Sequence, residues 1–147
     1  MNVNPSVSRH FLVLDDDRER IRGFTAVLER LGCDWALRAW RDAQSMIAEI
    51  EPVLGSAQLI SLDHDLYRES PSEPDPGSGR LVADFLSRRA PVCPVIVHST
   101  NTNAAWGMFN ELTAAGWQVE LVHHLDQPGW IEHAWLPVAR RLVPVLP

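Results

Sequence analysis

Short apolar runs alternate with segments of helical periodicity along most of the chain, and this alternation constrains the fold more than any other feature. We expect each apolar run to be a buried strand and each periodic segment a helix packed on the sheet, as in repeated βαβ units. The predicted strands cover residues 11–14, 35–40, 59–62, 92–97 and 118–122, and the predicted helices cover 21–31, 43–50, 81–86, 106–112 and 130–143. The second strand has the weakest apolar pattern and is expected at the edge of the sheet.

The number of units and the length of 147 residues fix the fold class. A closed barrel of such units needs about 250 residues, so an open sheet is predicted. We expect one α/β domain over residues 1–147, a doubly wound three-layer sandwich with a five-stranded parallel sheet in the order 2-1-3-4-5. Gly32 is placed to cap the first helix, and Pro52 and Gly55 to stop the second. Pro137 must either kink the last helix or mark a late start.

Residues 67–79 interrupt the pattern with Pro, Gly, Ser and acidic residues. The helical pattern resumes directly afterwards, so this segment is predicted to be a loop within the domain. We expect it to be a flexible loop that lies over the functional site.

Composition and charge exclude several kinds of chemistry. All 13 basic residues are Arg, so an amine nucleophile, a Schiff base and a P-loop lysine are excluded. The formal net charge of -6 argues against nucleic-acid binding through phosphate neutralisation over the whole surface. Cys33 and Cys93 lack the spacing of a zinc site and are predicted to be small buried hydrophobes. The absence of a leader pattern and of a long apolar run predicts a cytoplasmic protein that does not contact membranes.

Polar and titrating side chains follow four of the five predicted strands. Ligands of such folds bind at the carboxyl ends of the strands, so these residues are expected to meet at one edge of the sheet. They are Asp15, Asp16, Asp17 and Arg18 after the first strand; Asp63, His64 and Asp65 after the third; His98, Ser99, Thr100 and Asn101 after the fourth; and His123 and His124 after the fifth.

The acidic residues predict a divalent metal site. Carboxylates close together raise one another's pKa unless a cation compensates them, and Asp15, Asp16 and Asp63 are the candidate ligands. Oxygen ligands favour Mg²⁺ or Mn²⁺, while neighbouring imidazoles would also admit Fe²⁺ or Zn²⁺. The alternative is that these acids only cap the following helix, and this alternative is strongest for Asp17.

The histidines suggest proton transfer. His98 and His123 end neighbouring strands and are expected to face the same crevice as general acid and base, although the sequence does not say which gives the proton. His64 and Asp65 complete the candidate catalytic set. The alternative for each histidine is a structural hydrogen bond.

Three further residues are candidates for binding phosphate. Arg18 opens the first helix, where the free backbone N–H groups already favour an anion. Ser99 lacks the surroundings of a nucleophile and is expected to donate a hydrogen bond to a phosphoryl oxygen, with Asn101 beside it. Tryptophans could stack a base, but core packing is their commoner use; those considered are Trp106, Trp117, Trp130 and Trp135.

The order of these residues resembles the receiver domain of two-component signalling. In that family the positions of Asp15, Asp16, Asp63 and Ser99 bind Mg²⁺, accept a phosphoryl group and contact it. The essential lysine of the family falls at His123, so a standard aspartyl-phosphate switch is not expected.

The sequence resembles more closely the receiver-like family of cyclic-phosphate processing domains. The motifs that carry this resemblance are LDDDR at 14–18, SLDHDL at 61–66 and HSTN at 98–101, with Met108 further on, while Ala104 stands where the family is expected to have glycine. The resemblance covers residues 11–124. It implies a role with cyclic phosphate ends of RNA or nucleotides, in the context of RNA-repair proteins.

Three functions remain open from the sequence. The first is a metal-dependent phosphoesterase that opens a 2′,3′-cyclic phosphate at the end of an RNA or on a nucleotide. The second is a catalytically inactive pseudo-receiver that binds a phosphate ligand or a partner protein, and the third is a receiver phosphorylated on Asp63. The sequence leaves the oligomeric state undetermined.

Overall fold

The computed structural model describes residues 8–124 and 126–147, and these contain a five-stranded sheet with all its strands parallel. Its order is β2-β1-β3-β4-β5, as predicted. The strands are β1 (His10–Leu14), β2 (Ala36–Trp40), β3 (Ala57–Leu62), β4 (Val95–Ser99) and β5 (Val119–His123). Strand β2 is the terminal strand of this order and pairs with β1, which confirms that it is an edge strand. The doubly wound α/β class is therefore confirmed.

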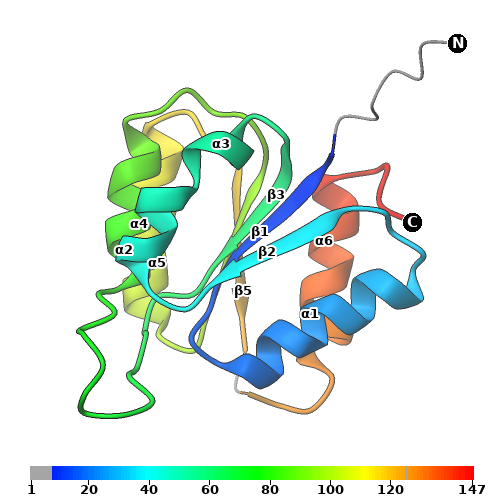
Figure 1. Cartoon of the computed structure of the whole chain (residues 1–147). Helices are drawn as coiled ribbons and strands as arrows, with labels where there is room; N and C mark the ends of the chain where they lie inside the picture. Colours follow the sequence, from blue (N-terminus) through cyan, green and yellow to red (C-terminus); the bar gives the residue numbers. More distant parts are fainter. Residues whose placement is uncertain (1–7, 125) are drawn as a thin grey trace, which may run out of the picture.

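Helices cover both faces of the sheet (Figure 1). One face carries α2 (Ala43–Glu49), α3 (Glu51–Leu54), α4 (Gly79–Ser87) and α5 (Thr102–Ala114), and the other carries α1 (Arg18–Arg30), the π-helical turn η1 (Ile131–Trp135) and α6 (Leu136–Leu142). A hydrophobic core lies on each face of the sheet, and strand β1 contributes side chains to both. Leu12 and Leu14 point to the first face, and Phe11 and Val13 point to the second. No described helix is long and apolar enough to cross a membrane.

Prolines account for three differences from the predicted boundaries. Strand β4 begins at Val95 and not at residue 92, because Pro94 has no N–H to donate to a neighbouring strand. Pro52 lies in the first turn of α3, where a missing N–H is tolerated, so it starts a short helix as well as ending α2. Pro137 lies in the first turn of α6, and the wider turn η1 directly precedes it.

The prediction that Cys33 and Cys93 are buried is wrong. Each is only partly buried, at the margin of a hydrophobic core. Most of the tryptophans considered pack in the core, which is the commoner role that the sequence analysis gives them. Trp117, Trp130 and Trp135 are buried, whereas Trp106 is about half exposed.

The first helix begins directly after β1 because of a side-chain cap. The carboxylate of Asp17 accepts hydrogen bonds from the backbone N–H groups of Glu19 and Arg20, so this residue has the capping role that was its alternative interpretation. At the other end, Gly32 follows the helix with a φ of 65°, as expected for a cap. The cap fixes where the first turn of α1 lies relative to the strand ends.

The loop over residues 67–79 projects from the carboxyl edge of the sheet (Figure 1). A single antiparallel bridge between Asp65 and Ser78 closes its base. Glu69 fastens it to the body of the domain through ion pairs with Arg18 and Arg41. Its flexibility stays a prediction.

Gly79 holds α4 against the end of β3, and replacing it tests this contact. A Cβ added there would lie 1.9 Å from the backbone oxygen of Asp63. We expect Gly79→Ala to lower the free energy of unfolding by at least about 1–3 kcal/mol, because backbone has to move. Urea denaturation measures this. Gly55→Ala is the control, since the added Cβ meets nothing within 4 Å and the φ there is -65°. Equal stability of the two variants would contradict the prediction.

Candidate functional site

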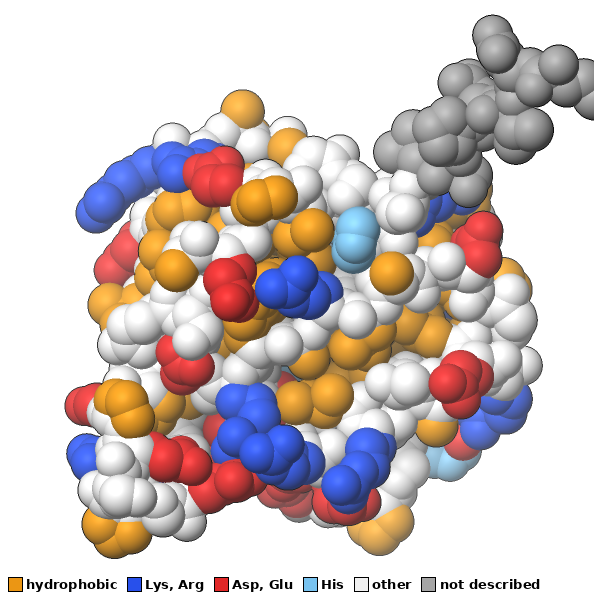
Figure 2. All heavy atoms as spheres, viewed as in Figure 1, with side chains coloured by type: hydrophobic (Ala, Val, Ile, Leu, Met, Phe, Trp, Pro, Cys, Tyr) orange, Lys and Arg blue, Asp and Glu red, His pale blue; other side chains and the backbone are white. Residues whose placement is uncertain are grey.

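A pocket of about 260 Å³ lies among the carboxyl ends of the strands. It is lined by Asp16, Asp17, Arg20, Asp63, Asp65, Tyr67, Thr100, His124 and Asp126. Figure 2 shows basic and acidic side chains side by side along the corresponding lower edge of the molecule. Of the predicted site residues, Asp16, Asp63 and Asp65 line the pocket.

Asp15 lies beneath this pocket and is fully buried. Its Oδ1 accepts from the backbone N–H of Asp17 at 2.9 Å, and its Oδ2 is 2.8 Å from His98 Nε2. The Nε of Arg20 donates to both oxygens at 3.0 Å. Burial alone would raise the pKa of Asp15, but the bonds from His98 and Arg20 hold it below its usual value. Asp15 is therefore a buried anion with a donor on each oxygen.

His98 joins Asp15 to the last helical segment through a buried polar chain. The indole Nε1 of Trp135 donates to Ser61 Oγ at 3.1 Å, and Ser61 Oγ lies 2.6 Å from His98 Nδ1. An ionised carboxylate only accepts, so Nε2 donates to Asp15 while Nδ1 shares a hydrogen bond with the serine hydroxyl. Both ring nitrogens are thus occupied and the side chain is fully buried. The structure places His98 as a support for Asp15, away from direct contact with a ligand.

Arg20 is the central cation of the site, and the sequence reasoning missed it. Its Nη2 lies 3.2 Å from Asp63 Oδ2 and 3.4 Å from Asp16 Oδ1, and its Nη1 lies 3.0 Å from Asp126 Oδ1. The sequence pattern favours Arg18, but the Nε of that residue lies 2.7 Å from Glu69 and its side chain is 58% exposed. Side chains two positions apart in the sequence point about 200° apart around a helix axis. Only one of these two arginines can therefore face the strand ends.

Asp63 is the most perturbed carboxyl group of the pocket. Burial, with Asp15 and Asp16 nearby, raises its pKa to about 8 even though Arg20 opposes the shift. Burial also raises the pKa of Asp16, although the backbone N–H of Tyr67 donates to it at 3.0 Å. One guanidinium is therefore not enough to compensate the carboxylates gathered here.

Another carboxylate of the pocket, Asp65, orients His64. Its Oδ1 lies 2.6 Å from His64 Nδ1, and the amide of Asn101 donates to both of its oxygens at 3.3–3.4 Å. The amide oxygen of Asn101 in turn accepts from the backbone N–H of Ala104 and caps α5. Asn101 therefore holds Asp65 and the helix, and its polar atoms are already engaged.

The prediction that His98 and His123 face one crevice is wrong. Strand register pairs Ser99 with His123 and His98 with Val122, and neighbouring residues of a strand point to opposite faces. Ser99 and His123 instead line a separate hollow of about 20 Å³. There the Ser99 hydroxyl accepts from the N–H of Asn101, and His123 Nδ1 lies 3.1 Å from Thr102 Oγ1.

His124 is the histidine of β5's end that reaches the pocket. Its ring stacks on Trp130 with centroids 3.9 Å apart and an interplanar angle of 6°. Nδ1 accepts from the backbone N–H of Asp126 at 3.3 Å, and Nε2 is buried with no hydrogen-bond partner among the described residues. Burial, with His98 and Arg20 nearby, lowers the pKa of His124 to about 4. The ring is therefore neutral near pH 7, with its proton on Nε2.

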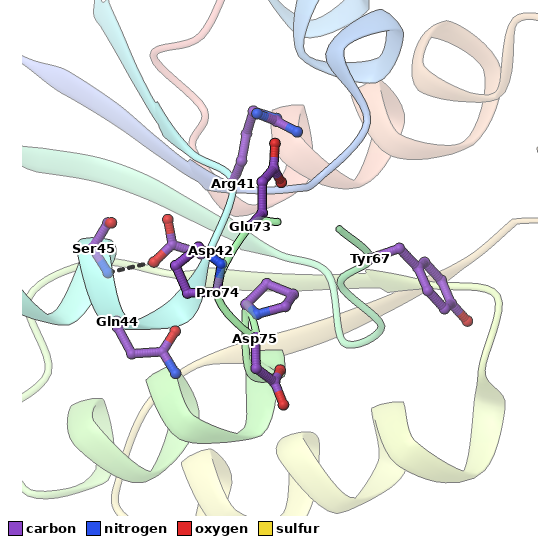
Figure 3. A pocket seen from close by; sticks show the side chains of 9 residues that line it. Arg41, Asp42, Gln44, Ser45, Tyr67, Glu73, Pro74 and Asp75 are labelled. Carbon is purple, nitrogen blue, oxygen red and sulfur yellow. Dashed lines mark hydrogen bonds between the residues drawn. The ribbon is translucent and has the colours of Figure 1, made fainter. Parts of the chain in front are cut away.

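A larger hollow of about 520 Å³ lies beside the loop 67–79. Figure 3 shows Arg41 beside Glu73, and the ring of Tyr67 turned away from the other labelled side chains. The charged groups here already have structural partners: Asp42 caps α2 through Ser45, and the Nε of Arg41 donates to the backbone oxygen of Asp16. We therefore assign the chemistry to the strand-end pocket.

The topology and the strand-end acids define a receiver-like protein. Solved receiver domains that share this fold include a response regulator receiver domain from Rhodospirillum rubrum, 18% identical with a TM-score of 0.60, covering 90% of this chain and 89% of that one. A CheY-like receiver domain from Methanospirillum hungatei is 18% identical with a TM-score of 0.62, covering 92% and 94%. A chain of the CheX–CheY–BeF₃⁻–Mg²⁺ complex from Borrelia burgdorferi is 12% identical with a TM-score of 0.61, and the match covers 88% of this chain and 88% of that one.

Sequence comparison narrows this class further. Residues 11–114 match the family described as the cyclic-phosphate processing receiver domain. The chain therefore belongs to that family. No curated protein is similar enough in sequence to count as a relative.

Proposed function

We propose that this domain binds the 2′,3′-cyclic phosphate of a nucleotide or an RNA end in the strand-end pocket and opens the ring by hydrolysis. The observation that carries the proposal is a cation among acids at the strand ends: the guanidinium of Arg20 lines one pocket with Asp16, Asp63 and the ring of His124. A phosphoryl group carries negative charge and several acceptor oxygens, so it matches a guanidinium. Membership of a cyclic-phosphate processing family supports this choice of ligand.

The carboxylates of the pocket fit a divalent cation, and we propose Mg²⁺ or Mn²⁺. Arg20 already brings a positive charge to these carboxylates, because its Nη2 contacts both Asp16 and Asp63. These two carboxylates would hold the ion, with Asp15 beneath them, whereas His98 is engaged by Ser61 and Asp15. When bound, such an ion supplies a Lewis acid for the phosphoryl group.

The residues around the pocket divide the remaining tasks. The ring of His124, at the lining of the pocket, helps to orient the ester. His64, held by Asp65, moves the proton, and water adds to phosphorus while one ring P–O bond breaks and its oxygen takes a proton. His98 holds Asp15 in place. This assignment gives the proton transfer to His64 and not to the histidine pair that the sequence suggested.

Phosphorus NMR of a 2′,3′-cyclic mononucleotide and of a cyclic-phosphate-ended oligoribonucleotide tests the proposal. We expect ring opening with Mn²⁺ that is lost in Asp63→Asn. His64→Ala is expected to lower turnover by about 10²-fold or more, and the control His123→Ala to leave it unchanged.

Two outcomes would contradict the enzymatic proposal. Line broadening that requires Asp63, without turnover, would identify a binding module. Equal losses in His64→Ala and His123→Ala would remove His64 from the mechanism. Intact mass after treatment with a phosphodonor would separately reveal phosphorylation of Asp63.

A further inference from the structure

Arg20 contacts Asp16 and Asp63, the two carboxylates that would hold the divalent cation of the proposed function. We infer that Arg20 is a tethered counter-ion that competes with a divalent cation for Asp16 and Asp63. The inference rests on the proposed metal-assisted function and concerns how the metal enters the site. In the metal-free chain the guanidinium supplies the positive charge, and a divalent cation binds by displacing it.

The two cations compete for the same two carboxylates. Nη2 of Arg20 lies 3.4 Å from Asp16 Oδ1 and 3.2 Å from Asp63 Oδ2. An ion that took both oxygens as ligands would compete with this nitrogen for the same carboxylate lone pairs. Two positive groups that close repel strongly in a partly buried site.

If Arg20 leaves, Asp15 still has a hydrogen-bond donor for each of its carboxylate oxygens. Besides Arg20, Oδ1 of Asp15 accepts from the N–H of Asp17, and Oδ2 accepts from His98. Each oxygen of this buried carboxylate thus keeps one donor. The Arg20 side chain is 15% exposed and lines the pocket, so its way out leads to solvent.

Arg18 is a matched control on the same helix. It lies two residues earlier and its Nε donates to the exposed Glu69, outside the acidic cluster. Removing it changes the net charge of the protein as much as removing Arg20. A difference between the two variants therefore reports position and not total charge.

NMR of the arginine side chains in the wild-type protein tests displacement directly. The Nε–H of Arg20 donates to a fully buried carboxylate, so it should exchange slowly with water when metal is absent. We expect saturating Mg²⁺ to remove this protection and to leave the signal of Arg18 unchanged. Metal binding seen at the backbone amides of Asp16 and Asp63, with the Nε–H of Arg20 still protected, would overturn the inference.

Calorimetric titration with Mg²⁺ provides the second readout. Arg20→Gln should bind Mg²⁺ about tenfold or more tightly than the wild-type chain, and Arg18→Gln should match the wild type within about twofold. Equal affinities of wild type and Arg20→Gln, or binding by neither, would overturn the inference. If ring opening persists in EDTA, the domain is a phosphoesterase that needs no metal, and only the inference about Arg20 fails. Failure of this inference is therefore distinguishable from failure of the proposed hydrolysis. If Arg20→Gln does not fold, the wild-type NMR experiment decides.

Discussion

Replacement of His98 with Ala is expected to lower the free energy of unfolding by about 3–5 kcal/mol. The side chain is fully buried, and its two nitrogens contact Ser61 and Asp15. The substitution removes a charge-assisted bond from a buried carboxylate and leaves a cavity beside Phe24 and Trp130. Urea denaturation followed by circular dichroism measures the loss. The sequence alone predicts His98 as a general acid or base, with a structural hydrogen bond as the alternative.

His123→Ala is the control for this experiment. His123 also ends a strand, but it is exposed and its ring contacts Thr102. Its replacement should change stability by no more than about 0.5 kcal/mol. A loss below 1 kcal/mol in His98→Ala, on the order of a surface change, would show that the buried chain does not stabilise the fold.

The stability advantage of wild type over Asp63→Asn is expected to fall by about 3 kcal/mol between pH 5 and pH 7 without metal. The pKa of Asp63 is about 8 in the folded chain, whereas the ordinary pKa of an aspartate is 3.8. Between these values the folded chain keeps a proton that the unfolded chain has released. Stability from this group is therefore lost as the pH rises, by about 1.4 kcal/mol per pH unit. Denaturation series of both proteins in EDTA at pH 5, 6 and 7 measure it.

Taking the difference between the two proteins removes an opposing contribution. The pKa of His124 is about 4 in the folded chain, whereas the ordinary pKa of a histidine is 6.5, so its contribution to stability increases as the pH rises between these values. This contribution is common to wild type and variant and cancels in the comparison. Parallel pH profiles for the two proteins would refute the raised pKa of Asp63.

The sequence predicted the part of the site that depends on strand ends. Asp16, Asp63 and Asp65 line one pocket because the carboxyl ends of parallel strands meet at one edge. The direction of each side chain needed information that the strand assignment lacked. His123 and His124 point to different places because a shift of one residue along a strand changes the face.

The direction of the Arg20 side chain likewise depends on the exact residue at which its helix begins. The predicted helix began at residue 21, whereas Asp17 caps a helix that begins at Arg18. With the correct cap, Arg20 falls in the first turn, where its side chain can reach back to the acids after β1. The capping pattern at Asp17 was the available signal, since it fixes the rotation of the turn that follows.

The buried polar chain makes the site depend on sequence far from its motifs. The family match ends at residue 114, but the indole that donates to Ser61 belongs to Trp135 in η1. Strand β5 and His124 also follow the matched region. A fragment trimmed to residues 11–114 would leave Ser61 and His98 without the cover of the last helical segment. Expression of the isolated domain for any biochemical work should therefore extend through α6, at Leu142.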